Sequence, residues 1–189
     1  SGMSIPLSLK KNEKSLNIDW QEVFKIGKRG ISLLFIGVLM VNIGSVNSEL
    51  TGMSKYQWGT GVLLAVVLLF NTYFTGRIKV VIRIVAAIAI ITAILLFKGG
   101  TAESPFWLRT QWWGIVGLIG WAYIFVSLYY VLSGRHWWAA GIGMVLFLLI
   151  YAADMAGIFG VPNSPDLILR PGIQIGGHGF IMCSGLFLG

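Results

Sequence analysis

The chain has 189 residues, of which 56% are hydrophobic and 11% are charged. Soluble domains carry about 25% charged residues, so this composition and the mean hydropathy of +0.80 exclude an ordinary soluble domain. They predict an integral membrane protein. The formal net charge of +7 comes from 14 basic and 7 acidic residues.

Six segments are apolar enough to be expected as membrane-spanning helices. A span needs about 20 residues to cross about 30 Å of hydrocarbon, and the runs are continuously apolar, whereas strands of a membrane barrel alternate. Lys79 and Arg83 lie near the start of the third segment, where long side chains reach the headgroups. The fold class expected is therefore all-α, a polytopic bundle of six segments. They are residues 30–48, 56–76, 78–97, 110–134, 136–153 and 171–189.

Residues 10–29 are the polar, charged exception. They predict a loop or an amphipathic helix whose apolar positions are Ile18, Trp20, Val23 and Phe24.

Both ends of the chain are apolar. The first nine residues, "SGMSIPLSL", run directly into Lys10 and Lys11 and are typical of the tail of a preceding helix, and "FIMCSGLFLG" ends without a basic flank. We therefore expect residues 1–189 to form a single transmembrane domain from the middle of a larger protein. The single cysteine, Cys183, excludes an intrachain disulfide.

Basic residues gather on one side of the expected spans. If the segment before the first span is cytoplasmic, the cytoplasmic loops hold ten of the 14 Lys and Arg residues and the opposite loops hold four. Such a bias in short loops is a positive-inside signal, so the net charge predicts orientation and not nucleic-acid binding. The ten are Lys10, Lys11, Lys14, Lys25, Lys28, Arg29, Arg77, Lys79, Arg83 and Arg135, and the four are Lys55, Lys98, Arg109 and Arg170.

The stretch "RTQWWGIVGLIGWAY", residues 109–123, begins with two tryptophans that suit a membrane–water interface. Beyond them, one helical face carries small and apolar residues, and a second stripe of glycines lies on the first span. Small residues let helix backbones approach closely, so these faces predict helix packing. The first face is Trp113, Gly117, Gly120, Ile124 and Ser127, and the second is Gly30, Gly37 and Gly44.

Four stretches resemble a known family. "LRTQWWGIVGLIGWAY" (108–123) and "KRGISLLFIGVLMVN" (28–42) are the most specific, with "SGMSIPLSL" and "GGHGFIMCSGLFLG" in the matching order. They are similar to segments of bacterial relatives of the heparan-alpha-glucosaminide N-acetyltransferase family. At Gly61 to Leu64 the chain departs from the family, many members of which have a glutamine after the leucine.

The resemblance implies a polytopic enzyme of ten or eleven helices in a bacterial inner membrane. Such an enzyme moves acetyl from cytoplasmic acetyl-CoA to the amine of a terminal glucosamine across the membrane. The family's catalytic histidine would lie upstream of Ser1, so neither His136 nor His178 is expected to replace it, and this chain alone is expected to be inactive. The implied partners are membrane lipids, an amino-sugar acceptor, the remaining helices and a second copy in a homo-oligomer.

Rare polar residues in the apolar runs are the candidate substrate-binding residues, because an intramembrane polar group is costly. Asn42 matches the "VN" that ends the family's third helix, with an interhelical hydrogen bond as the alternative. His178 and Asp154 could contact the amino sugar, with packing and a solvated helix end as their alternatives. For the phosphates of acetyl-CoA the candidates are Lys28, Arg29 and Arg83, which otherwise set topology and contact anionic lipid.

Other functions are less well supported by the sequence. The two histidines, one cysteine and scattered carboxylates lack the spacing of metal ligands, and no phosphate loop or dinucleotide fingerprint is present. A transporter with helices broken at Gly141–Gly143 or Gly176–Gly177 and a membrane scaffold without chemistry both remain open.

The basic-residue bias generates the first prediction, that residues 45–58 and 99–113 lie outside and residues 10–29 and 76–83 inside. Single cysteines at Ser48 and Ser15, in a Cys183→Ser background, should differ in labelling by an impermeant maleimide on intact cells. Equal labelling at the two positions would contradict this orientation.

Overall fold

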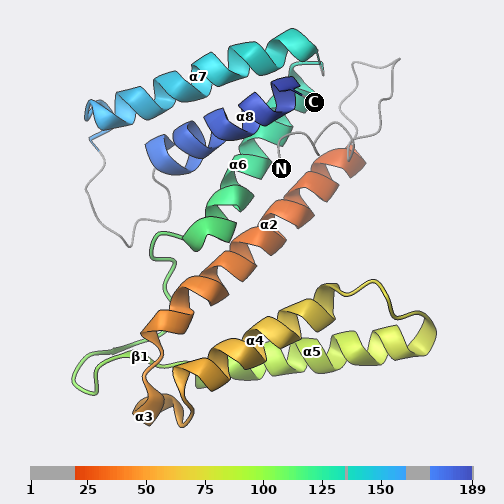
Figure 1. Ribbon diagram of the computed structural model, residues 1–189, viewed down its shortest axis with the longest axis vertical. Coiled ribbons are helices and arrows are strands. Elements are labelled where there is room, and N and C mark those ends of the chain that lie inside the picture. The colour runs from red at the N-terminus through yellow and green to blue at the C-terminus, as the bar shows by residue number, and fades with distance from the viewer. Residues whose placement is uncertain (1–19, 135, 161–170, 189) are drawn as a thin grey trace. The chain divides into compact units, whose positions relative to one another are not determined.

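The computed structural model describes residues 20–134, 136–160 and 171–188, and these are mostly helical (Figure 1). Several parts of the sequence lie outside the described residues. They are the expected helix tail at residues 1–9, residues 10–19 of the polar stretch, Arg135 and Arg170. The long helices are α2 (Trp20–Asn42), α4 (Lys55–Phe70), α5 (Gly76–Leu96), α6 (Gly114–Leu132) and α7 (Trp137–Met155). The shorter elements are η1 (Ile43–Ser45), α3 (Ser48–Thr51), β1 (Gly99–Gly100), β2 (Pro105–Phe106), the π-helix η2 (Pro171–Gly177) and α8 (His178–Leu188).

The all-α expectation is confirmed, whereas the expectation of six full spans is not. Within the described residues, four stretches are long and apolar enough to cross a membrane: Trp20–Ser45, Gly76–Leu96, Gly114–Leu132 and Trp138–Met155. The helix α4 has 16 residues, about 24 Å at 1.5 Å per residue. The last segment is divided into a seven-residue π-helix and eleven residues of α8.

The polar stretch before the first span is helical from Trp20 onward, so the expectation of a loop is wrong for residues 20–29. Charged side chains do not stop a helix while its backbone hydrogen bonds continue. Ile26 and Glu22 are buried on this first part of α2, but Trp20 and Phe24 are exposed. The expected apolar positions are therefore not the buried face.

The described chain falls into two compact units, each with its own apolar core. Unit 1 takes its residues from 1–35 and 115–189, and unit 2 comprises 36–114.

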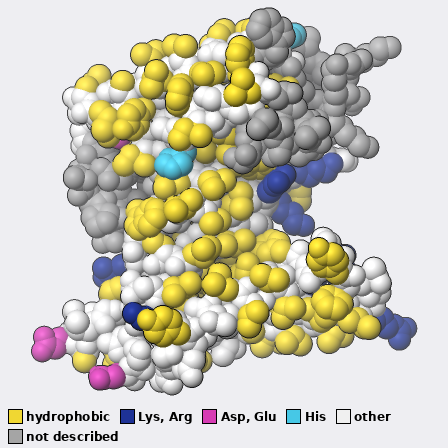
Figure 2. Space-filling view, viewed as in Figure 1, with side chains coloured by type: hydrophobic (Ala, Val, Ile, Leu, Met, Phe, Trp, Pro, Cys, Tyr) yellow, Lys and Arg dark blue, Asp and Glu magenta, His cyan; other side chains and the backbone are white. Residues whose placement is uncertain are grey.

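In unit 2, α4 and α5 lie side by side as a helical hairpin (Figure 1). Two tryptophans complete the end of α5: Nε1 of Trp58 donates to the Ala93 carbonyl and Nε1 of Trp107 to the Ile94 carbonyl, both at 2.9 Å. The last carbonyls of a helix lack partners within it; the Trp58 indole pairs with the Ala93 carbonyl, and the Trp107 indole adds a second donor to the Ile94 carbonyl, which also accepts from the Phe97 nitrogen at 3.3 Å. Apolar side chains cover much of the visible outward surface of α4 and α5 (Figure 2).

In unit 1, α7 packs against η2 and α8 through glycines. A Cβ at Gly172 would overlap the side chain of Asp154, and one at Gly176 would lie 2.6 Å from the Tyr151 nitrogen. Farther along, a Cβ at Gly179 would lie 2.8 Å from the Phe147 ring. The backbones approach closely because these positions have no side chain.

The packing of α2 on α6 in unit 1 confirms the expected glycine contact. A Cβ at Gly120 would lie 3.0 Å from Leu33 Cβ and 3.2 Å from the Gly30 carbonyl oxygen. Gly44, the last member of the second stripe, has open space around it.

We therefore predict that Gly120→Ala lowers the free energy of unfolding by about 1–3 kcal/mol, because the new methyl group meets backbone that cannot move aside. The matched control is Gly27→Ala on α2, where a Cβ would meet open space. It should stabilise the protein by up to about 1 kcal/mol through helix propensity. Unfolding in mixed detergent–SDS micelles measures both variants, and a neutral Gly120→Ala would show that the two helices are not in close contact.

Candidate functional site

Asn42 ends α2 in unit 2 and is completely buried. Its Nδ2 donates to the carbonyls of Val38 and Arg109, each at 2.7 Å, and its Oδ1 accepts from the Arg109 backbone nitrogen at 3.3 Å. Both amide hydrogens and the oxygen are therefore engaged with backbone. This geometry favours a hydrogen bond between segments over a contact with substrate.

Around Asn42, residues 43–54 and 97–113 form a compact region that we call the loop cap. Asn47 donates from its backbone nitrogen to the Lys98 carbonyl at 2.9 Å and from Nδ2 to the Gly100 carbonyl at 2.8 Å. Thr51 Oγ1 donates to the same Lys98 carbonyl at 3.0 Å. The two loops that were expected on one side of a membrane are thus hydrogen-bonded to each other.

The entry to α6 has an unusual backbone. Gln111 and Trp113 have φ angles of +45° and +67°, and Gly114 has +66°. A non-glycine residue in this region costs about 1–3 kcal/mol and persists only where its surroundings hold it. Gln111 is held by a hydrogen bond of 3.1 Å from its Nε2 to Ser45 Oγ, and Trp113 is buried. Trp112, by contrast, is 52% exposed, as expected for an interfacial indole.

Asp154 and His178 both lie in unit 1, on the paired elements α7 and η2–α8. Asp154 is half-buried one residue before the end of α7, directly against Gly172 of the π-helix. His178 begins α8, and its Nδ1 lies 2.8 Å from the Ile173 carbonyl oxygen. The structure therefore places two of the three predicted substrate-binding residues on one helix pair, and Asn42 in the other unit.

The contact of His178 assigns its tautomer. A carbonyl oxygen only accepts, so Nδ1 carries the hydrogen, and in the neutral ring Nε2 is then an acceptor. His178 is partly exposed, which leaves Nε2 able to accept from a ligand. Long π-helical runs are rare, and π-type turns often mark functional sites.

The predicted donor-binding cations are exposed and belong to both units. Lys28 and Arg29 are neighbours on α2 in unit 1, and Arg83 lies on α5 in unit 2. The Arg29 guanidinium carbon lies 5.2 Å from the centroid of the buried Tyr123 ring, which is a cation–π contact. The contact holds the guanidinium over the ring, and the side chain is otherwise exposed.

Several polar residues of the described chain were missed by the sequence analysis. Asn47 and Thr51 organise the loop cap, Gln174 is buried in the π-helix, and Ser127 Oγ is buried without a hydrogen-bond partner. For Ser127 the sequence predicted only that it lies on a face that packs against another helix. Within the described residues, no three His, Cys, Asp or Glu side chains are grouped as metal ligands.

Two of the stretches that carry the sequence resemblance meet in the structure. Asn42 closes the stretch 28–42, and Arg109 lies in the stretch 108–123, so two hydrogen bonds between the Asn42 side chain and the Arg109 backbone join them. In comparisons with known proteins, no protein-family model, no curated protein and no solved structure matches the chain.

We predict that Asn42→Ala lowers the free energy of unfolding by about 1–3 kcal/mol, because it removes the hydrogen bonds that a fully buried side chain makes to the Val38 carbonyl and to the Arg109 backbone. The matched control is Asn71→Ala, where the lost hydrogen bond from the Tyr73 nitrogen is in an exposed turn and the cost should stay below about 1 kcal/mol. Hydrogen exchange at the Arg109 amide should accelerate in Asn42→Ala alone. If the free energy of unfolding and the hydrogen exchange were both unchanged, the Asn42 side chain would not stabilise the fold and would be available to bind a ligand.

Proposed function

We propose that the chain is part of an integral-membrane acyltransferase that moves acetyl from cytoplasmic acetyl-CoA to the amine of a glucosamine-type sugar across the membrane. The observation that carries the proposal is the junction of Asn42 with Arg109, because it joins the two most specific resemblance stretches. The part of the chain that the structure describes has four helices long and apolar enough to span a membrane, which is consistent with such an enzyme.

The reaction defines what the protein must provide. The acceptor nitrogen attacks the thioester carbonyl, a C–N bond forms, the C–S bond breaks, and the thiol of coenzyme A leaves with the proton lost by the amine. The step needs a base for that proton and hydrogen-bond donors for the thioester oxygen. In this proposal the base belongs to the family's histidine, and the described residues hold the donor and the acceptor.

For the donor, the proposal assigns Lys28 and Arg29, neighbours on α2, to the phosphates, and Arg83 on α5 is a separate candidate that is tested by itself. Arginine binds phosphate through two parallel N–H groups on one edge of its planar fork. The Arg29 guanidinium lies over the Tyr123 ring, and its side chain is exposed, so its N–H groups are accessible to a phosphate. Lysine contributes a point charge beside it.

For the acceptor, the proposal assigns Asp154 and His178. A protonated amino sugar is a cation, which the half-buried carboxylate of Asp154 would attract. Nε2 of His178 can accept a hydrogen bond from a sugar hydroxyl. Both residues lie on the α7 and η2–α8 pair, whose close packing through Gly172 and Gly176 keeps them in place.

A transporter is the second candidate, favoured by one observation. Transporters bind substrates at irregular helices, and the π-helix η2 precedes the regular α-helix α8 in the last apolar segment. The other expected break does not occur, since α7 is continuous through Gly141–Gly143.

Binding of acetyl-CoA by the reconstituted chain tests the donor assignment. Arg29→Ala and Arg83→Ala should each weaken binding about 10- to 150-fold, the effect of losing one charge-assisted contact of about 1.5–3 kcal/mol. Arg29→Lys should retain part of the affinity because the charge remains.

Lys55→Ala is the matched control, since Lys55 also stacks on an aromatic ring, with its Nζ 5.1 Å from the Tyr56 ring centroid, but in the loop predicted to lie outside. It should bind acetyl-CoA like the unmodified chain. Equal affinity in all four variants, or no binding by the unmodified chain in lipid nanodiscs, would remove the donor site from the proposal.

A further inference from the structure

The α4–α5 hairpin of unit 2 carries an apolar belt that is shorter than a typical membrane is thick. Arg83 is exposed on α5, and the charge-free part of that helix after it, residues 84–96, rises by about 20 Å at 1.5 Å per residue. The whole of α4 rises by about 24 Å. A hydrocarbon core measures about 30 Å, so both helices fall short of it by several ångströms.

A hydrogen bond between the two helices places Arg83 at the level of the end of α4. Nε1 of Trp58 donates to the Ala93 carbonyl, and the helices run side by side in opposite directions (Figure 1). Arg83 precedes Ala93 by as many residues as Leu68 follows Trp58. Since α4 ends at Phe70, the belt ends at the same level on both helices, to within a helical turn.

Aromatic side chains mark the other end of the belt. Tyr56, in the first turn of α4, is 74% exposed, and the Lys55 ammonium lies 5.1 Å from the centroid of its ring. Trp107 is 58% exposed, and its indole is held by the hydrogen bond of 2.9 Å to the Ile94 carbonyl. Tyrosine and tryptophan favour the membrane–water interface, so these two rings place this end of the hairpin at the headgroups.

Across the described residues of α4 and α5, no exposed side chain between these two ends is charged, and the large ones, such as Leu64 and Ile88, are apolar. A charge within hydrocarbon is costly. The acidic residues of unit 2 are Glu49 and Glu103, both in the loop cap at the opposite end of the hairpin from Arg83. Within unit 2, the Arg83 guanidinium therefore has to be solvated by headgroups and water.

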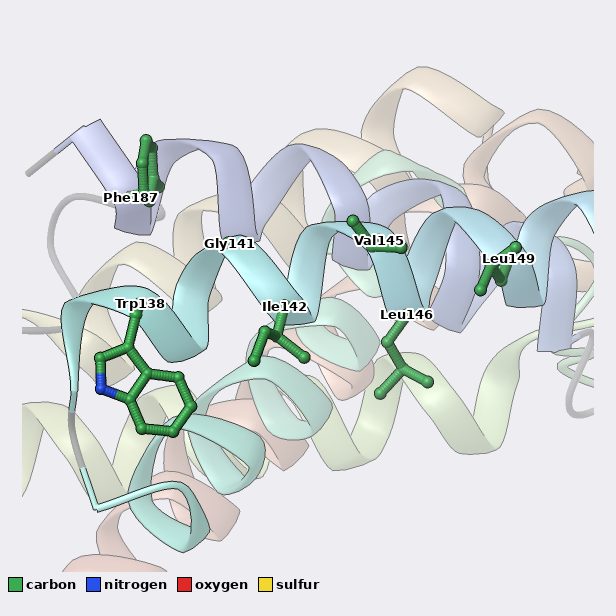
Figure 3. A pocket seen from close by; sticks show the side chains of 7 residues that line it. All are labelled: Trp138, Gly141, Ile142, Val145, Leu146, Leu149 and Phe187. Atoms are coloured by element: carbon green, nitrogen blue, oxygen red, sulfur yellow. The ribbon is translucent and has the colours of Figure 1, made fainter.

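The helix α7 of unit 1 carries a longer belt. Its residues 137–153 are uncharged and rise by about 26 Å, close to a full hydrocarbon core. Exposed side chains of this run, among them Ile142, Val145 and Leu149, line an apolar groove (Figure 3). The short belt is therefore a feature of unit 2 and not of every helix in the chain.

A belt shorter than the hydrocarbon is accommodated by thinning of the bilayer, by snorkelling of flanking side chains or by oligomerisation. Snorkelling is open to Arg83 but not to the end of α4, because residues 69–76 contain no Lys or Arg. From this geometry we infer that the bilayer around unit 2 is thinned to about 20–24 Å, with short-chain lipids on the α4–α5 face and Arg83 at their headgroups. The inference holds whether or not Arg83 also binds acetyl-CoA, because it concerns the apolar belt.

Spin labels on single cysteines, in the Cys183→Ser background, test the thinning in phosphatidylcholine bilayers with eighteen-carbon acyl chains. Gln57→Cys and Phe70→Cys place labels at exposed positions near the two ends of α4, about 20 Å apart along the helix, and Leu64→Cys places one between them. Accessibility to oxygen and to a water-soluble nickel chelate measures the depth of each label. Both end labels should lie at headgroup depth, and the Leu64→Cys label should lie in hydrocarbon and be accessible to oxygen.

An end label within the hydrocarbon would overturn the inference, because a bilayer of unchanged thickness cannot place both ends of α4 at the headgroups. Low oxygen accessibility at Leu64→Cys would also overturn it, since the face would then be covered by protein, such as a second copy. In mixed bilayers, brominated fourteen-carbon phosphatidylcholine should quench a fluorophore at Leu64→Cys more strongly than the brominated twenty-two-carbon lipid. Equal quenching would exclude the preference for short chains.

Arg83→Leu tests the boundary itself. It should move the Phe70→Cys label into the hydrocarbon by up to about 6 Å, one helical turn, because the next cation along α5 is then Lys79. The matched control is Arg77→Leu, which removes a cation outside the belt and should leave the label at headgroup depth. A label that stays in place in Arg83→Leu would overturn the assignment of Arg83 to the headgroup boundary.

Discussion

An apolar surrounding leaves no water to pair with backbone N–H and C=O groups, so each must find a partner within the protein. Helices meet this requirement along their length and fail at their ends. In unit 2 side chains supply further partners: Trp58 and Trp107 donate to carbonyls in the last turn of α5, and Asn42 at the end of α2 donates to the carbonyl of Arg109 in the loop before α6. The loop cap adds hydrogen bonds between its two loops, and its strained entry to α6 is tolerated because Gln111 and Trp113 are held within it.

The same constraint explains which parts of the fold could be predicted from sequence. Runs without charge located a helix in each of the six segments, because continuous apolar residues in a membrane require helical hydrogen bonding. They misplaced the ends. The run 56–76 stays uncharged through Tyr73 and Phe74, but α4 ends at Phe70. There the chain turns, and the Asn71 side chain accepts a hydrogen bond from the Tyr73 nitrogen. The π-helix had no signal in hydropathy, since α- and π-helices bury the same residue types and differ only in hydrogen-bond register.

The sequence identified the candidate site residues only through the rarity of polar residues in apolar runs. Asn42, Asp154 and His178 were selected because polar residues inside apolar runs are costly, and that criterion does not distinguish a group paired with backbone from one available to a ligand. The structure supplies the distinction: the amide of Asn42 is fully engaged, whereas His178 uses one ring nitrogen on the Ile173 carbonyl and keeps the other as an acceptor. Asn47 and Thr51 were not predicted from the sequence because they lie in a loop, where polar residues are common. Only their hydrogen bonds across the loop cap distinguish them from other loop residues.

Glycines determine where the chemically active side chains of unit 1 can lie. The Asp154 carboxylate rests against Gly172, and any larger residue there would displace it. One turn farther along, Gly176 brings the backbone of η2 against that of α7 at Tyr151, which places the start of α8, and with it His178, at a fixed distance from α7. A membrane helix has no hydrophobic force to press it against its neighbour, so close van der Waals packing has to hold the pair together. The residues without side chains thus fix the positions of Asp154 and His178.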